Sequence, residues 1–249
     1  FNTGKAAIGT GPYKLVRYAK GDRIELVRND NWWGGKTPWE KVTLRLVTND
    51  AARVAALLSG DVQAIENVPT ADVAKLKQDK RLALFRQTSD RLMYVHMDSN
   101  RDVTPTVTAK DGKPLATNPL KDPRVRKAMS MAINRPLIVE RVMEGEAVPA
   151  GQLVPDFLFG ATKNLKVEKH DPEGARKLLA EAGYPDGRDA KTGRPLVLNY
   201  DFYAPPTPER KPEIDWVVRQ FAKIDIQREV RATDNNQFQD KVRKGKHQV

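Results

Sequence analysis

The stretch KDPRVRKAMSMAINR, residues 121–135, sets the fold because it carries a complete set of helix signals. Asp122 is suited to cap a helix, and Pro123 fits the first helical position. Apolar residues then recur at i, i+3, i+4, i+7 and i+8, the spacing of one helix face. They are Val125, Ala128, Met129, Ala132 and Ile133. The pattern predicts a helix that buries one face against another layer of secondary structure.

Strands and short helices alternate on both sides of this helix, which predicts an α/β fold with mixed sheets flanked by helices. Strands are predicted at 13–15, 24–26, 42–46, 62–68, 82–85, 92–97, 196–200 and 226–230. The first two form a hairpin around a turn at residues 20–22. Further helices are predicted to begin at or beside Asp50, Pro69, Pro136, Asp171, Pro212 and Phe238.

Residues 101–121 interrupt this alternation. The stretch is rich in threonine and proline and contains an Asp111-Gly112 turn signal. We therefore predict a surface excursion, with a small hairpin around the turn.

Composition excludes several classes of function. The 249 residues include 43 Lys and Arg against 32 Asp and Glu, a formal net charge of +11, and no cysteine. A thiol nucleophile is therefore excluded, and no metal site is predicted because His96, His170 and His247 lie far apart in the sequence. No apolar run approaches the roughly 20 residues of a membrane-spanning helix. The charge leaves a basic nucleic-acid-associated module as an alternative, although the basic residues are spread singly.

No catalytic constellation stands out in the sequence. His96 and Asp98 share one face of a predicted strand, so a hydrolase that uses this pair stays an alternative, while a hydrogen-bonded strand histidine is favoured. Trp32, Trp33 and Trp39 surround a predicted turn, where packing at the end of a sheet is favoured over stacking on a ligand. The residues alone thus predict a binding or structural α/β protein rather than an enzyme.

Five segments in order resemble one family, the large extracytoplasmic solute-binding proteins of ABC importers, of the dipeptide, oligopeptide and nickel type (family 5). They include a GTGPY strand, a stretch similar to the family's "YWggk" segment, and the helix segment DPRVRKA. The five segments are Ile8–Tyr13, Arg28–Lys36, Ala51–Val62, Lys121–Arg135 and Asp171–Tyr184.

The resemblance implies a two-lobed fold of the periplasmic-binding-protein type II kind, incomplete at both ends. Residues 1–92 would form part of the first lobe and residues 93–249 part of the second. The implied function is capture of peptides or a similar small solute for an ABC permease of the inner membrane, without a cofactor, a nucleic acid or an enzymatic step. The implied protein is a monomer in the periplasm, or lipid-anchored outside the cell. A chain that begins at Phe1 is expected after removal of an export signal, and also for a piece of a longer protein.

The resemblance also suggests three ligand-binding residues. Asp98 stands where the family often has Asn at the end of the strand that crosses between the lobes. Tyr203 matches a loop that faces the cleft after the strand at 196–200. Asn235 opens the last predicted helix, where peptide binders often place an aromatic residue.

Overall fold

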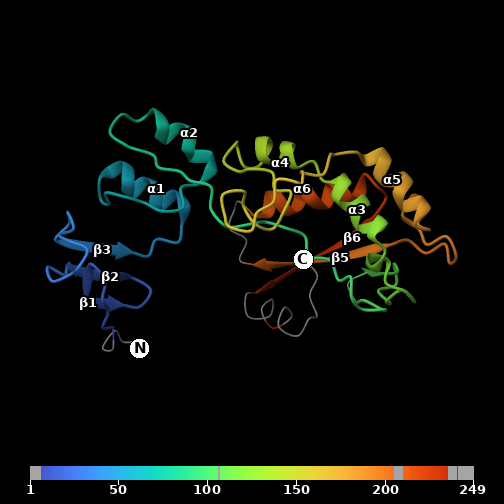
Figure 1. Cartoon of the computed structure of the whole chain (residues 1–249), viewed down its shortest axis with the longest axis horizontal. Helices are drawn as coiled ribbons and strands as arrows, with labels where there is room; N and C mark the ends of the chain where they lie inside the picture. The colour runs from blue at the N-terminus through green and yellow to red at the C-terminus, as the bar shows by residue number, and fades with distance from the viewer. Residues whose placement is uncertain (1–6, 106, 205–209, 235–239, 241–249) are drawn as a thin grey trace. The chain divides into compact units, whose positions relative to one another are not determined.

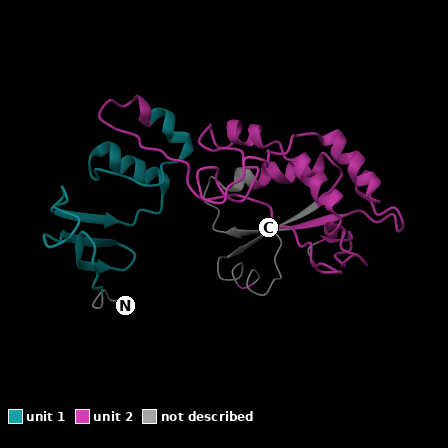
Figure 2. Cartoon of the chain, in the orientation of Figure 1, with its two compact units in different colours: residues 1–75 teal, residues 76–249 magenta. Residues whose placement is uncertain are grey.

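A computed structural model describes residues 7–105, 107–204, 210–234 and 240. The chain forms two compact units, Phe1–Lys75 and Leu76–Val249 (Figure 2). The boundary lies earlier than the predicted lobe boundary after residue 92. Because compactness alone does not assign a segment to a lobe, the lobe assignment stays a prediction.

Unit 1 is built on an antiparallel sheet of three strands in the order β1-β2-β3 (Figure 1). These are β1 (Tyr13–Ala19), β2 (Arg23–Arg28) and β3 (Lys41–Arg45). The tight β1–β2 connection contains Gly21 at φ 77°, a left-handed conformation that favours glycine. The predicted hairpin and the strand after it are confirmed.

Two helices follow this sheet, α1 (Asp50–Ser59) and α2 (Thr70–Gln78). The Asn49 side chain caps α1 by accepting a hydrogen bond from the Ala52 N–H at 2.9 Å. Gly60 ends the helix in the left-handed conformation, as its sequence position predicts.

The tryptophan-rich turn after β2 does not pack as predicted. Trp33 is 86% exposed and Trp39 is 64% exposed. The rings of Trp32 and Trp33 lie 5.6 Å apart, so these two side chains contact each other at the turn. The prediction that they plug the end of the sheet is wrong for Trp33 and Trp39.

Unit 2 contains most of the helices and a well-packed core. The helical elements are η1 (Pro119–Lys121), α3 (Pro123–Ala132), α4 (Arg135–Arg141), α5 (Pro172–Glu181), η2 (Pro185–Gly187) and α6 (Arg210–Ala222). The helix predicted from residues 121–135 is confirmed as α3, and the Asp122 carboxylate caps it by accepting from the Arg124 N–H at 2.8 Å. Among the described residues, no helix has both the length and the apolar character to cross a membrane.

The sheet of unit 2 combines antiparallel and parallel pairing, with strand order β4-β5-β6. Strand β4 (Val107–Thr108) is antiparallel to β5 (Val197–Ala204), which is parallel to β6 (Gln227–Asp234). In Figure 1 the helices α3, α5 and α6 lie to one side of β5 and β6. The core of unit 2 is formed by these elements and the segments beside them, and its largest almost fully buried side chains are Leu120, Met129, Leu179, Phe221 and Ile224.

The small hairpin predicted around Asp111-Gly112 is confirmed by an antiparallel bridge between Thr108 and Pro114, but the prediction that residues 101–121 form a surface excursion is wrong for their apolar side chains. Val107, Leu115 and Leu120 are buried in the unit 2 core, with exposed fractions of 3%, 7% and 1%. The reason is that β4 pairs with β5, which places Val107 opposite Leu198 inside the unit. The threonines and prolines around these apolar residues suggested a surface loop.

The strand predictions at 62–68, 82–85 and 92–97 are also wrong, because the structure gives these residues no ladder partner. A strand is stable only when a neighbouring strand satisfies its backbone groups. Strand β5 is longer than predicted and runs on to Ala204. The helix expected over 238–244 falls outside the described residues, apart from residue 240.

Candidate functional site

A cavity of about 700 Å³ opens beside the extended segment 90–99 in unit 2. This volume lies in the range of small-molecule binding sites. The segment supplies seven of the lining residues, and Arg126 of α3 and Leu153 close the other side. The segment's seven are Asp90, Leu92, Tyr94, Val95, His96, Met97 and Ser99. The lining therefore combines apolar surface with a few polar groups, as ligand sites do.

Tyr94 and His96 bring two rings to the cavity. Their ring centroids lie 6.4 Å apart at an interplanar angle of 48°. Tyr94 is 59% exposed, so its ring is accessible from the cavity. The pair offers a phenol, an imidazole and two flat faces, which suit stacking and hydrogen bonding to a solute.

Arg126 contributes the cationic group of the cavity. Its Nη1 donates to the carbonyl oxygens of Leu120 at 2.7 Å and Lys121 at 2.9 Å, which fixes the guanidinium at the start of α3. No described residue accepts from its Nε or Nη2, so these donors can meet a ligand. A planar guanidinium held in this way is well suited to a carboxylate.

The predicted site residue Asp98 lies next to this cavity but is used inside the fold. Its side chain is only 8% exposed. The carboxylate accepts hydrogen bonds from Arg101 Nη1 at 2.7 Å and from Thr104 Oγ1 at 2.9 Å. Burial raises the pKa of Asp98, but hydrogen bonds from Thr104 and Arg101 outweigh burial and hold the pKa below its usual range. Asp98 therefore anchors the turn that follows the cavity segment, and direct contact with a solute stays a prediction.

Asn118 fastens the same turn to η1. Its Nδ2 donates to the carbonyl oxygens of Asp98 at 2.7 Å and Arg101 at 2.9 Å. Its Oδ1 accepts from the Leu120 N–H at 2.9 Å. Asn118 is 5% exposed, so water could not easily replace these hydrogen bonds if the side chain were removed. Sequence reasoning missed this residue, although Asn before Pro119 is a recognisable capping signal.

Of the other two predicted site residues, only Tyr203 is among the described residues. Tyr203 lies within β5 rather than in a loop after it, and it pairs in register with Thr233. Asn235 lies outside the described residues, one position after β6 ends at Asp234. In open α/β sheets, ligands bind beyond the carboxyl ends of parallel strands, and Tyr203 lies near that end of β5.

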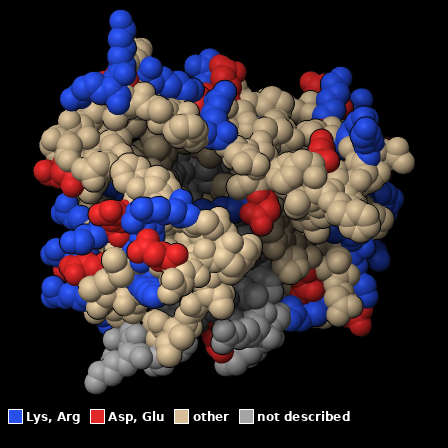
Figure 3. Space-filling view, turned by 60° about the vertical axis from the view of Figure 1, so that its left-hand side comes forward, with Lys and Arg blue, Asp and Glu red and all other residues tan. Residues whose placement is uncertain are grey.

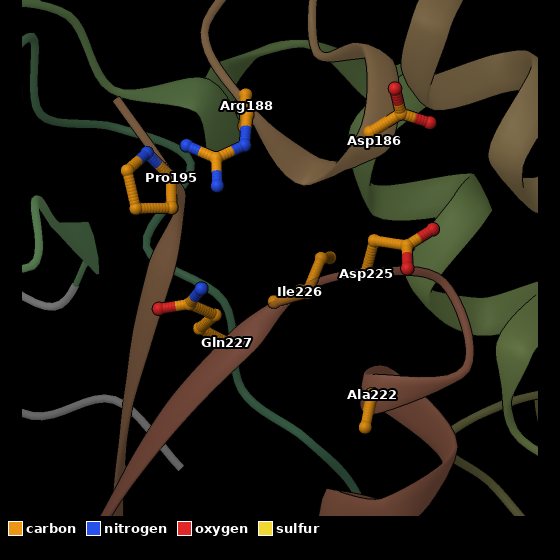
Figure 4. A pocket seen from close by; sticks show the side chains of 7 residues that line it. All are labelled: Asp186, Arg188, Pro195, Ala222, Asp225, Ile226 and Gln227. Atoms are coloured by element: carbon orange, nitrogen blue, oxygen red, sulfur yellow. The ribbon is translucent and has the colours of Figure 1, made fainter. Parts of the chain in front are cut away.

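A second cavity, of about 350 Å³, lies at the opposite edge, where β5 and β6 begin (Figure 4). Figure 4 shows Arg188 and Gln227 beside Pro195, with the carboxylates of Asp186 and Asp225 on the other side. Asp225 is already paired with Arg176 at 3.2 Å. Because this second cavity is lined by both acidic and basic side chains, its charge does not indicate one class of ligand. The cavity beside segment 90–99 is therefore the better candidate for a binding site.

The described residues contain no group of three or more His, Cys, Asp or Glu that could hold a metal ion. On the face shown in Figure 3, basic side chains are spread over the surface with acidic ones among them. The basic side chains behind the high net charge therefore do not form one continuous patch on that face.

Comparison with known proteins relates the chain to one family. The model for bacterial extracellular solute-binding proteins, family 5 Middle, matches residues 1–249. Heme-binding protein A of Haemophilus influenzae is 27% identical over 219 residues, 88% of this chain and 36% of that protein. The dipeptide-binding protein of Escherichia coli is 26% identical over 247 residues, 97% of this chain and 41% of that protein.

A solved structure shows the fold. It is the ABC transporter-associated periplasmic binding protein DppA from Helicobacter pylori, in complex with the peptide STSA. The TM-score is 0.69 at 22% identity, covering 96% of this chain and 41% of that one. The expected binding-protein fold with mixed sheets and flanking helices is confirmed for the part present. The chain spans about two fifths of the length of these relatives.

Proposed function

The chain belongs to family 5 of the bacterial extracellular solute-binding proteins, and from this premise we propose that it forms part of the solute-binding component of an ABC importer. The solute is a peptide or a similar small molecule. The relatives are named for heme and for dipeptides, and the solved DppA structure holds a peptide. These names indicate a class of small solutes rather than one compound.

One observation in the chain itself carries the proposal: the cavity beside segment 90–99, with Tyr94, His96 and Arg126 in its wall. The two rings offer stacking surfaces, and the guanidinium offers donors for a carboxylate such as a peptide C-terminus. Asp98 and Asn118 position the segment through their buried hydrogen bonds. Tyr203, near the carboxyl end of β5, and Asn235, which lies outside the described residues, are proposed as additional ligand residues.

The proposal extends to partners and location. The solute is handed to an ABC permease of the inner membrane, and the protein acts as a monomer in the periplasm or lipid-anchored outside the cell. The relative solved as a periplasmic, ABC transporter-associated protein supports this placement. The relatives are named as binding proteins, which supports capture without chemical conversion of the solute.

Thermal unfolding of the full-length protein with pooled dipeptides and tripeptides tests the proposal. A ligand at about 100 times its Kd stabilises the folded state by about 2.7 kcal/mol, a measurable rise in Tm. Deletion of the gene should also abolish uptake of the peptide identified in this way. Failure of every pool to raise Tm, or unchanged uptake of an identified peptide in the deletion strain, contradicts the proposed function.

The 249-residue chain alone is expected to fold but to bind the solute more weakly than the full-length protein. A partial cleft lacks part of its contacts and excludes less water. Titration calorimetry on both proteins measures the difference. Equal affinity would show that residues 1–249 hold the whole site.

A further inference from the structure

An exposed apolar loop connects α4 to α5 in unit 2 (yellow in Figure 1). Its middle carries Phe157, Leu158 and Phe159, here called the apolar tip. Phe159 is fully exposed and Phe157 is 57% exposed. The other large apolar side chains exposed along the same loop are Val148, Leu153, Leu165 and Val167. Because such side chains are unfavourable in water, a long exposed run of them indicates a contact surface.

Hydrogen bonds give this loop a defined shape. The Gln152 side chain joins its two ends, because Nε2 donates to the Thr162 carbonyl oxygen at 3.0 Å and Oε1 accepts from the Thr162 N–H at 3.1 Å. The same Nε2 donates to Asp156 Oδ1 at 2.9 Å. Gly160, at φ 90°, turns the chain directly after the apolar tip. Residues 152–162 therefore form a compact Ω-loop that presents the tip as a fixed surface.

Cations follow the apolar tip where the chain returns to α5. Lys163, Lys166 and Lys169 are all exposed, and none of them pairs with a carboxylate among the residues that the structure describes. Residues 152–169 contain two acidic residues, Asp156 and Glu168, against these three lysines. The stretch thus keeps a net positive charge and combines an apolar tip with unpaired ammonium groups.

An anionic lipid surface matches both features. In proteins that bind at the surface of a membrane, Phe and Leu side chains enter the boundary between headgroups and acyl chains, while lysines lie against acidic headgroups. We propose that residues 152–169 form a membrane-contact loop for a bilayer that contains anionic phospholipids. The apolar tip enters the bilayer surface, and Lys163, Lys166 and Lys169 approach the lipid phosphates. The contact is peripheral and reversible, because only a few apolar side chains insert. It goes beyond solute capture and does not depend on it.

Cosedimentation of the full-length protein, produced without lipidation, with phospholipid vesicles tests this contact. The wild type should bind vesicles of equal parts phosphatidylglycerol and phosphatidylcholine, should bind phosphatidylcholine vesicles much more weakly, and should be released by salt. The double variant Phe157→Ser, Phe159→Ser should lower the partition coefficient on the mixed vesicles by at least about tenfold. Replacing Lys163, Lys166 and Lys169 together with Gln should also lower it by at least about tenfold.

Two matched controls separate the loop from general surface effects. Phe85→Ser removes a phenylalanine that is 92% exposed but lies outside the loop. Replacement of Lys110, Lys191 and Lys223 with Gln removes the same charge from exposed positions elsewhere in unit 2. Both controls should bind the mixed vesicles as the wild type does. Circular dichroism checks that each variant is folded, and Phe159→Ala alone serves if the double variant is not.

Three results would overturn the proposal. The first is a wild type that does not bind the mixed vesicles, which would assign the apolar tip to a protein contact, including one with the rest of the full-length chain. The second is a folded tip variant that binds as well as the wild type. The third is an equal loss in the lysine control, which would reduce the contact to overall charge. Solute capture is measured separately by the peptide-pool assay, so it stands or falls independently of these results.

Discussion

Replacing Asn118 with alanine should loosen the turn that holds the cavity segment. The side chain makes three hydrogen bonds, to the Asp98 and Arg101 carbonyls and from the Leu120 N–H. At about 1 kcal/mol for each bond, the substitution should lower the free energy of unfolding of unit 2 by about 3 kcal/mol. For a unit of this size that loss corresponds to a fall in Tm of roughly 6–12 °C.

Urea unfolding followed by far-UV circular dichroism measures this loss. Asn100→Ala is the matched control, because Asn100 is exposed and contributes to the same turn through its backbone N–H, at 3.3 Å from Asp98 Oδ1. The control should stay within about 0.5 kcal/mol of the wild type. Solute affinity should fall with stability in Asn118→Ala only, since the segment then loses its fixed position. An Asn118→Ala protein as stable as Asn100→Ala would refute the view that this side chain fastens the turn.

Three further perturbations test other parts of the structure. The pKa of Asp98 is lower in the folded protein than in the unfolded chain, so Asp98 stabilises the fold fully above the unfolded-state pKa of about 3.9, and this stabilisation is lost as the pH falls below that value. Asp98→Asn should therefore flatten the acid limb of a plot of Tm against pH. An acid limb that is the same in the wild type and in Asp98→Asn would contradict this role of Asp98. Gly187 and Gly193 have nearly the same φ, 66° and 67°, but a Cβ at Gly187 would collide with the Asp225 carbonyl oxygen, while Gly193 has open space. Gly187→Ala should therefore cost at least about 2 kcal/mol more than Gly193→Ala in urea unfolding, and equal losses would contradict the close approach. Tyr203→Ala in the full-length protein should weaken solute binding by roughly 1–3 kcal/mol in calorimetry while Tm is kept, and a lower Tm with unchanged affinity would instead assign the residue to packing.

The elements that the sequence predicted well are those whose signals are local. Helix α3 has its cap at Asp122, its proline at the first position and its apolar stripe within one stretch, so nothing outside that stretch was needed. The strand at 107–108 was missed because its partner lies far along the chain, at 197–198. Its burial comes from that pairing and not from its neighbours in the sequence.

The candidate site was predictable only in part for the same reason. The resemblance led to Asp98, but its hydrogen bond with Thr104, six residues further on, forms in an irregular turn that no periodic spacing indicates. The cavity itself forms where Arg126 and Leu153 approach the segment that contains Tyr94 and His96. The spacing of two residues between Tyr94 and His96 indicates a shared face, as does the same spacing between His96 and Asp98, but only the latter pair was predicted to act together.

The pairing of β4 with β5 also has a consequence for the order of events during synthesis. The Asn199 side chain donates to Thr108 Oγ1 across a sequence separation of 91 residues, and β6 follows only after α6. Helices such as α3 and α5 form from local contacts in well under a millisecond, whereas joining segments so far apart requires closing a long loop. During synthesis, apolar residues of the earlier segments, such as Leu120, therefore stay without their core partners until β5 and β6 have been translated. We therefore expect late closure of its sheet to limit the folding rate of unit 2.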